Sequence, residues 1–198
     1  MTRSAFTLLV LCLTAVVSSH ASAQRKPVRE VQMNIDAAPP PSDVPGLVSR
    51  AAAVVRVTVT DTATVSVNVA NASDVPPLPM TKVIGTVGEV FVKDSRLPSA
   101  GTVSFLVPGG EVDKGTHVER YLVPDTPAVE VGKTYLVFLG WYPAANSFSC
   151  LYGFGGLFEV NAGGKVVAYG RAPSARKLAD QHGADDFQRL VREASRRR

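Results

Sequence analysis

Nucleophilic chemistry in this chain would depend on Cys150. The only other cysteine in the sequence, Cys12, lies in an apolar N-terminal stretch. A reactive thiol needs a base or a helix N-terminus that lowers its pKa. His117 could serve as the base, but the residues around the cysteine, NSFSCLY, contain no helix start. Because free cysteine is among the most buried residue types, we interpret Cys150 as a core residue and keep a thiol hydrolase as an alternative.

Acidic side chains gather in two polar stretches. The first contains a set with metal-binding groups: Asp113, His117 and Glu119. Asp113 and His117 would share a face only on a helix, which Gly115 disfavours. In the second stretch Asp125 and Glu130 flank a proline, and paired carboxylates can act as general acid and base. We interpret both stretches as solvated loops, and a hydrolase that uses these carboxylates is the other form of the alternative.

No motif in the sequence predicts a cofactor or a metal. The glycine-rich pieces 153–156 and 163–165 do not follow a strand and open a helix, as a phosphate-binding loop must. The net charge is +4, and seven of the 21 lysines and arginines form two terminal clusters, at 25–29 and 192–198. Such terminal clusters are typical of solvated tails. Because no basic stripe runs through the region expected to fold, we expect no nucleic-acid partner.

One stretch favours binding over catalysis. Five aromatic side chains lie within residues 141–154, around a proline-containing turn, and four of them form our candidate binding surface: Trp141, Tyr142, Phe148 and Tyr152. Aromatic clusters make contact surfaces for proteins or sugars, and ordinary core packing is the alternative. Since neighbours in a strand point to opposite faces, either Trp141 or Tyr142 should point outward.

The elements that would position these residues are mostly strands. Residues 54–69 alternate valine with polar residues, which predicts a half-buried strand. Residues 80–93 predict a second long strand, whose internal Gly85 and Gly88 are typical of bulges in closed barrels. The polar stretch 111–120 is a loop or a hairpin. Further strands are predicted at 102–107, 121–123, 134–141, 151–160 and 165–169, the last two joined by a hairpin turn.

The chain ends in a predicted helix at residues 185–194. Its apolar face would contain Phe187, Leu190, Val191 and Ala194. Asp185 or Asp186 is expected to cap the first turn. About five to seven strands followed by one helix predict a mainly β fold, a small antiparallel OB-like barrel with a C-terminal helix.

Residues 1–23 have the pattern of a secretory signal peptide. A short basic start precedes the apolar stretch 5–17, and Ala21 and Ala23 fit a signal-peptidase cut before Gln24. The stretch is shorter than the roughly 20 residues of a membrane-spanning helix. We therefore expect a secreted or periplasmic mature chain that does not span the membrane.

The mature chain is expected to have three parts. Residues 24–45 contain five prolines and predict an extended linker. Residues 46–172 would form the β-barrel domain, and residues 173–198 the C-terminal helix and a basic tail.

Glycine turns and apolar strands recur in a fixed order along most of the chain. The segments are TKVIGTV at 81–87, FLVPGG at 105–110, VGKTYLVFL at 131–139 and YGFGGLFEV at 152–160. With the terminal helix, this order resembles a group of uncharacterised secreted bacterial proteins that have an OB-like β-barrel. The resemblance covers residues 52–194 and implies the fold, but it carries no catalytic residue over to this chain.

These observations predict an exported, non-catalytic β-barrel domain that binds a protein or glycan partner in the cell envelope. The alternative is a secreted hydrolase that uses Cys150 or the loop carboxylates.

Overall fold

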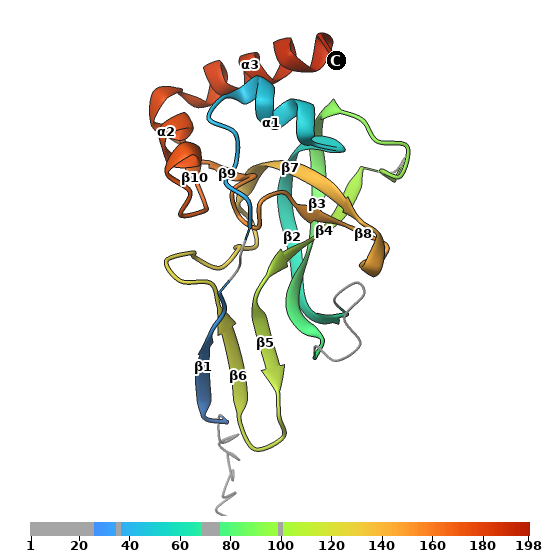
Figure 1. Cartoon of the computed structure of the whole chain (residues 1–198), viewed down its shortest axis with the longest axis vertical. Helices are drawn as coiled ribbons and strands as arrows, with labels where there is room; N and C mark the ends of the chain where they lie inside the picture. The colour runs from blue at the N-terminus through green and yellow to red at the C-terminus, as the bar shows by residue number, and fades with distance from the viewer. Residues whose placement is uncertain (1–25, 35–36, 69–75, 99–100) are drawn as a thin grey trace, which may run out of the picture.

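β-Strands dominate the part of the chain that the computed structural model describes, residues 26–34, 37–68, 76–98 and 101–198. Within it, ten strands form two sheets, and three α-helices and the short 3-10 turn η1 (Pro143–Ala145) complete the fold (Figure 1). The predicted signal peptide at 1–23 lies outside these residues and stays a prediction. No helix in the described ranges is long and apolar enough to cross a membrane.

A ring of five strands forms the centre of the fold. In order round the ring they are β2 (Ala53–Val67), β3 (Leu78–Val92), β4 (Thr102–Pro108), β8 (Ser147–Cys150) and β7 (Thr134–Tyr142). β7 pairs with β2, which brings the ring back to its start. β8 pairs in parallel with β4 over only two residue pairs, and antiparallel with β7 over four. The ring is therefore a partial barrel, and the prediction of a mainly β fold with a C-terminal helix is confirmed.

The inside of the ring is filled by the first of two hydrophobic clusters. Its members alternate along the strands and are almost fully buried, among them Val55, Val57, Phe105 and Tyr135. At Gly85 a Cβ atom would lie 2.4 Å from Cγ2 of Val57, so only glycine fits there. The β2–β3 ladder shifts register beside it, between Val59 and Asp61. The extra residue of this shift is Thr60 of β2, opposite Gly85, whereas a second shift makes Gly88 the extra residue of β3. The predicted bulge is therefore confirmed at Gly88, and at Gly85 it lies on the facing strand.

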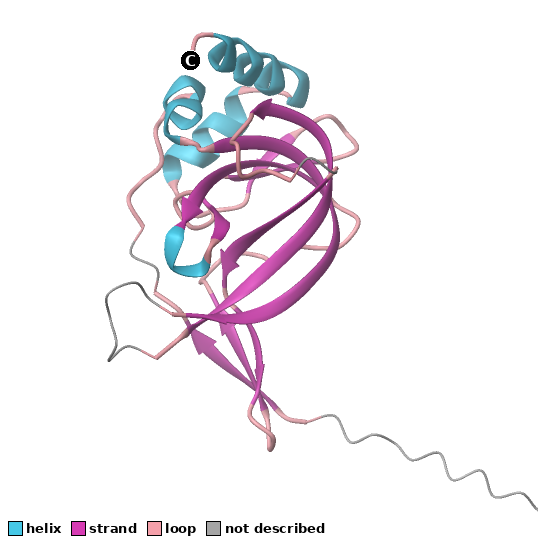
Figure 2. Ribbon diagram, turned by 90° about the vertical axis from the view of Figure 1, so that its right-hand side faces the viewer, coloured by secondary structure: helices cyan, strands magenta, loops and turns pink. Residues whose placement is uncertain are grey.

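The second cluster lies outside the ring, where three helices cover β7 and β9 (Leu157–Val160). The helices are α1 (Val44–Arg50), α2 (Pro173–Gln181) and α3 (Ala184–Arg196). Phe158 of β9 contacts Phe187 of α3, with ring centroids 5.0 Å apart. Figure 2 shows these helices together at one end of the curved sheet. Burial of their apolar faces is the main reason that such short helices are stable.

The predicted helix at 185–194 is confirmed as α3, but two details of the C-terminal segment differ from expectation. The N-cap is Gly183, without a capping side chain, so the expected cap by Asp185 or Asp186 is wrong. Both aspartates lie in the first turn, where their charge still favours the helix dipole. The terminal residue is also not a solvated tail, because the Arg198 guanidinium donates hydrogen bonds to the carbonyls of Val48 and Ala51.

The region before α3 contains shorter strands than predicted. A hairpin of β9 and β10 (Val166–Ala168) confirms the turn at 161–164. The predicted strand 151–160 begins only at Leu157, because Tyr152 and Gly153 have φ angles of 56° and 65° and turn the chain. β8 and α2 were not predicted, and neither was α1, which begins inside the predicted linker 24–45.

A small sheet extends from the open end of the ring (Figure 1). It consists of β1 (Val28–Gln32), β6 (Val118–Leu122) and β5 (Gly110–Asp113), in that order. The polar stretch 111–120 is thus a hairpin. β1 pairs in parallel with β6 and lies inside the segment 24–45 that we expected to be an extended linker. The side chains of β1 are mostly exposed. Its sequence therefore has no alternation of apolar and polar residues from which a strand could be predicted.

Candidate functional site

Cys150 is a buried core residue. It lies in β8, belongs to the cluster inside the ring and is 5% exposed. Burial raises the pKa of its thiol to about 12. The turn between β5 and β6, which includes His117, lies at the lower end of Figure 1, away from β8. A thiol with this pKa stays protonated at neutral pH and is a poor nucleophile.

The loop carboxylates are paired with cations. Lys26 donates to Asp113 at 2.8 Å and holds the pKa of that carboxyl below its usual range. Asp125 pairs with Arg171, and Glu130 with Lys133. Within the described ranges no group of three or more His, Cys, Asp or Glu side chains could hold a metal ion. These carboxylates are ion-pair partners at the surface. Asp125 and Glu130 lie in a loop, as predicted, whereas Asp113 is the last residue of β5, so the interpretation of the first stretch as a loop is wrong.

The four aromatic residues of the candidate binding surface do not share one surface. Trp141 and Phe148 pack edge to face, with ring centroids 5.2 Å apart. Phe148 is 4% exposed and belongs to the hydrophobic cluster inside the ring, so its side chain is part of the core. The guanidinium carbon of Arg96 lies 4.6 Å from the centroid of the Trp141 ring, a cation–π contact that covers the indole from outside.

Tyr142 points to the opposite face of β7, as the alternation along a strand requires. Its hydroxyl lies 3.5 Å from the carbonyl oxygen of Asn68, and its ring lines a groove on the outside of the ring. Tyr152 packs against the helix-covered cluster instead. Of the four predicted residues, Tyr142 alone faces this groove.

The outer groove, as we call it, runs across β3, β4 and β8 on the outside of the ring. It has a volume of about 370 Å³, and its apolar lining includes Met33, Val67, Leu78, Met80, Leu106 and Tyr142. None of its lining residues in the described part of the chain is Asp, Glu, Lys, Arg or His. Its polar groups are few, namely the Asn34 amide, the Ser149 hydroxyl and the tyrosine hydroxyl. Cys150 also belongs to the lining, although only 5% of the residue is exposed.

Strand parity explains why apolar side chains reach this surface. Val83 of β3 and Phe105 of β4 are paired and point into the ring. Their neighbours in the two strands therefore point outward. Leu106 forms the floor of the groove at 3% exposure, whereas Leu78 at its rim is 40% exposed. The described helices pack over β7 and β9 and not over this face.

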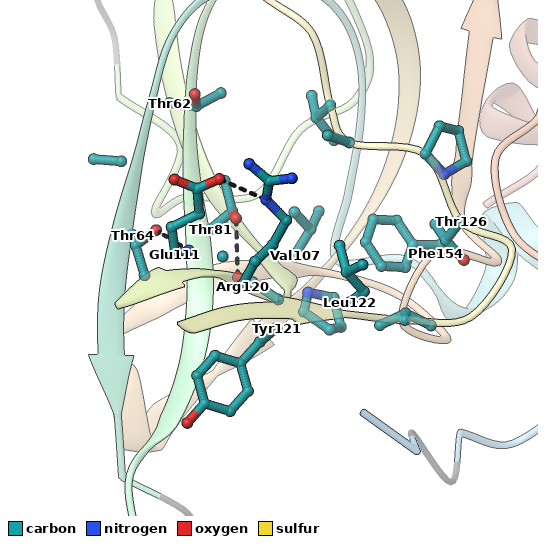
Figure 3. Close-up of a pocket in the computed structure, with 18 residues that line it drawn as sticks. Thr62, Thr64, Thr81, Val107, Glu111, Arg120, Tyr121, Leu122, Thr126 and Phe154 are labelled. Carbon is teal, nitrogen blue, oxygen red and sulfur yellow. Dashed lines mark hydrogen bonds and ion pairs between the residues drawn. The ribbon is translucent and has the colours of Figure 1, made fainter. Parts of the chain in front are cut away.

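A second cavity, the end cavity, lies between the ring and the small sheet (Figure 3). It has a volume of about 350 Å³ and four threonines in its lining: Thr62, Thr64, Thr81 and Thr126. Arg120 of β6 donates from Nε to Glu111 of β5 at 2.7 Å. Figure 3 shows this pair on one side of the cavity and Phe154 on the other.

The shape of the end cavity depends on two glycines at the end of β4. Gly109 and Gly110 have φ angles of 95° and 142°, which favour glycine. A Cβ at Gly110 would lie 2.7 Å from Oγ1 of Thr64. That hydroxyl accepts a hydrogen bond from the backbone N–H of Glu111 at 2.9 Å. The close approach joins the small sheet to β2 and fixes one wall of the cavity.

The opposite wall is the loop 123–131, which two buried tyrosines anchor. Tyr169 donates from its hydroxyl to the carbonyl of Ala128 at 2.6 Å, and the Tyr135 hydroxyl accepts from the backbone N–H of Glu130 at 3.2 Å. Burial raises the pKa of the Tyr169 phenol. Sequence reasoning missed both cavities, because their walls come from segments that are distant in the chain.

Comparisons with known proteins give no family for this chain. No protein-family model matches it, and its sequence has no significant match among curated proteins. Its function must therefore be argued from the two cavities.

Proposed function

We propose that this protein is an exported, non-catalytic binding domain that holds an apolar segment of a protein partner in the outer groove. The observation that carries the proposal is the lining of the groove, which is apolar and has no charged side chain among the residues that the structure describes. Contiguous apolar surface is costly to expose to water, and on a folded domain it typically marks a contact site.

The groove has the composition of a peptide-binding surface. Met33 and Met80 supply flexible, polarisable side chains that adapt to different apolar partners. Tyr142 adds a rigid aromatic wall with a hydroxyl at its edge. The few polar groups can orient a bound backbone while the apolar floor provides most of the affinity. A sugar would leave most of its hydroxyl groups without hydrogen-bond partners in such a lining.

The proposed location outside the cytoplasm depends on residues 1–23, whose pattern is that of a cleaved signal peptide. The resemblance to secreted bacterial OB-like proteins supports the same location. The proposed compartment is the periplasm or the external medium, where the partner would be a protein of the cell envelope.

A glycan is the second candidate ligand, and the end cavity favours it. Threonine hydroxyls and the Arg120–Glu111 pair provide donors and acceptors around a small apolar patch at Phe154. That mixture suits a hydroxyl-rich ligand. The two ligands would occupy different cavities, so variants can separate them.

The test is a selection of random peptides displayed on phage against the chain that begins at Gln24. We expect enrichment of peptides with clustered apolar residues. Leu78→Glu places a carboxylate against the bound apolar segment, where the described lining has no cation to pair with it, and should weaken their binding about 30-fold. The matched control is Val167→Glu, which makes the same kind of change on β10 at a residue of similar exposure, 46% against 40%.

Binding that Leu78→Glu leaves unchanged, or that Val167→Glu reduces equally, would overturn the proposal. Enrichment of no peptide, together with binding of an envelope polysaccharide that Arg120→Gln abolishes, would favour the glycan instead.

A further inference from the structure

The end of the molecule opposite the small sheet has an excess of positive charge. In α3 the ion pairs involve Arg189, with Asp186 and Glu193, and Arg192, with Glu89. Beyond these pairs lie four arginines for which the described part of the chain contains no ion pair: Arg50, Arg196, Arg197 and Arg198. All four are exposed. They bring together charges from the end of α1 and the end of the chain.

This cluster has a defined position on the helices. Arg198 donates from Nη1 to the carbonyls of Val48, at 3.3 Å, and Ala51, at 2.5 Å. These carbonyls end α1, where a cation is favoured by the helix dipole. The backbone N–H of Arg197 donates to the carbonyl of Ala194 at 3.2 Å. The guanidinium of Arg198 is therefore held at the end of α1, and the backbone of Arg197 at the end of α3.

A shallow apolar groove separates the two helices below these arginines. Its volume is about 320 Å³, and its apolar lining is Pro45, Val48, Leu190 and Ala194. Its polar lining is Ser49, Glu193, Arg197 and Arg198, and the Glu193 carboxylate is paired with Arg189. We call this surface the basic groove. It combines room for a few methylene groups with cations placed to meet an anionic headgroup.

We propose that the basic groove docks this protein onto the surface of a membrane that contains anionic lipid. Each arginine close to such a surface adds a similar increment of attraction, and stable attachment needs a second contribution, which the apolar groove supplies. The helices lie together at one end of the long axis in Figure 1, so this end can face a plane. The β2–β3 hairpin end, which carries Leu78, points the other way.

The test measures co-sedimentation of the chain that begins at Gln24 with vesicles of phosphatidylcholine, with or without phosphatidylglycerol. Binding should require phosphatidylglycerol and weaken as salt rises. The double variant Arg196→Gln/Arg197→Gln should lower the partition coefficient about 30-fold. The matched control, Arg176→Gln/Lys177→Gln, removes the same charge from exposed positions of α2, and should change it less than about threefold.

A second measurement reports the orientation. An environment-sensitive dye on Ser49→Cys, in the lining of the basic groove, should shift to shorter wavelength when anionic vesicles are added. The same dye on Thr116→Cys, in the turn between β5 and β6, should not. Cys150 is buried and does not compete for the label.

Three results would overturn the proposal. The first is equal binding to both kinds of vesicle, and the second is an equal loss in the two double variants, which would indicate net charge alone. The third is absence of vesicle binding with retention of a polyglutamate probe, which would indicate an acidic protein as the partner.

Discussion

The outside of the ring is apolar on two sides, and the helices of the described ranges cover only one of them. Over β7 and β9, side chains such as Phe138 and Phe158 are fully buried beneath the helices. Over β3 and β4, Leu78 and Met80 line an open groove instead. The same strand parity produces both surfaces. The difference indicates that apolar residues on the covered side stabilise the fold, while those on the open side are available to a partner.

The largest effect should come from the covered side. Phe158→Ala would leave a cavity between the rings of Phe138 and Phe187 and should lower the free energy of unfolding by about 3–5 kcal/mol. Leu78→Ser on the open side should change it by less than about 0.5 kcal/mol, because this side chain is 40% exposed. Urea denaturation measures both. Similar losses in the two variants would contradict the distinction between the sides.

The interior of the ring should be closed to reagents. We expect iodoacetamide to modify Cys150 at least about 100-fold more slowly in the native protein than in urea, because burial raises the pKa of the thiol to about 12 and blocks access. The rate follows from mass spectrometry of quenched samples. Rapid modification of the native protein would mean that the groove opens into the core, and would revive the thiol hydrolase.

The smallest effect concerns the end of the ring beside Trp141, the only tryptophan of the chain. The hydrogen bond from Arg96 lowers the pKa of Asp94 from 3.8 to about 2. A lowered pKa in the folded state means that the pair stabilises the protein above about pH 4 and is lost as the pH falls towards 2. Arg96 would then leave the indole ring.

Tryptophan fluorescence as a function of pH tests this prediction. The emission of the wild type should move to longer wavelength only below about pH 4. Asp94→Asn should have the shifted emission already at neutral pH. Identical titrations of the two proteins would show that Asp94 does not position Arg96.

Elements with a long apolar repeat can be predicted from the sequence. Elements that exist because a distant strand pairs with them cannot. The valines of β2 and the apolar face of α3 repeat over many residues, so both elements were predicted. β8 has four residues, two of them serine, and exists because β4 and β7 pair with it. β1 is likewise held by its ladder with β6.

The candidate site was harder to predict than the fold for the same reason. The outward direction of the Tyr142 side chain could be predicted, because neighbouring residues of a strand point to opposite faces and Trp141 points inward. The partners of Tyr142 in the outer groove could not be predicted. Met33, Leu78 and Leu106 are far apart in the sequence and come together only after the ring forms. Phe148 was misassigned, because an aromatic residue beside a turn has the same local pattern whether it is buried or exposed.

The most direct test of the central claim uses the methionines. The chain contains Met1, Met33 and Met80, so a protein that begins at Gln24 keeps two, and both line the outer groove. We would label their methyl groups with carbon-13 and titrate the protein with a selected apolar peptide. We predict that both NMR signals shift and saturate together, and that Leu78→Glu abolishes the shifts. Saturable binding of the peptide with both methionine signals unmoved would contradict the account.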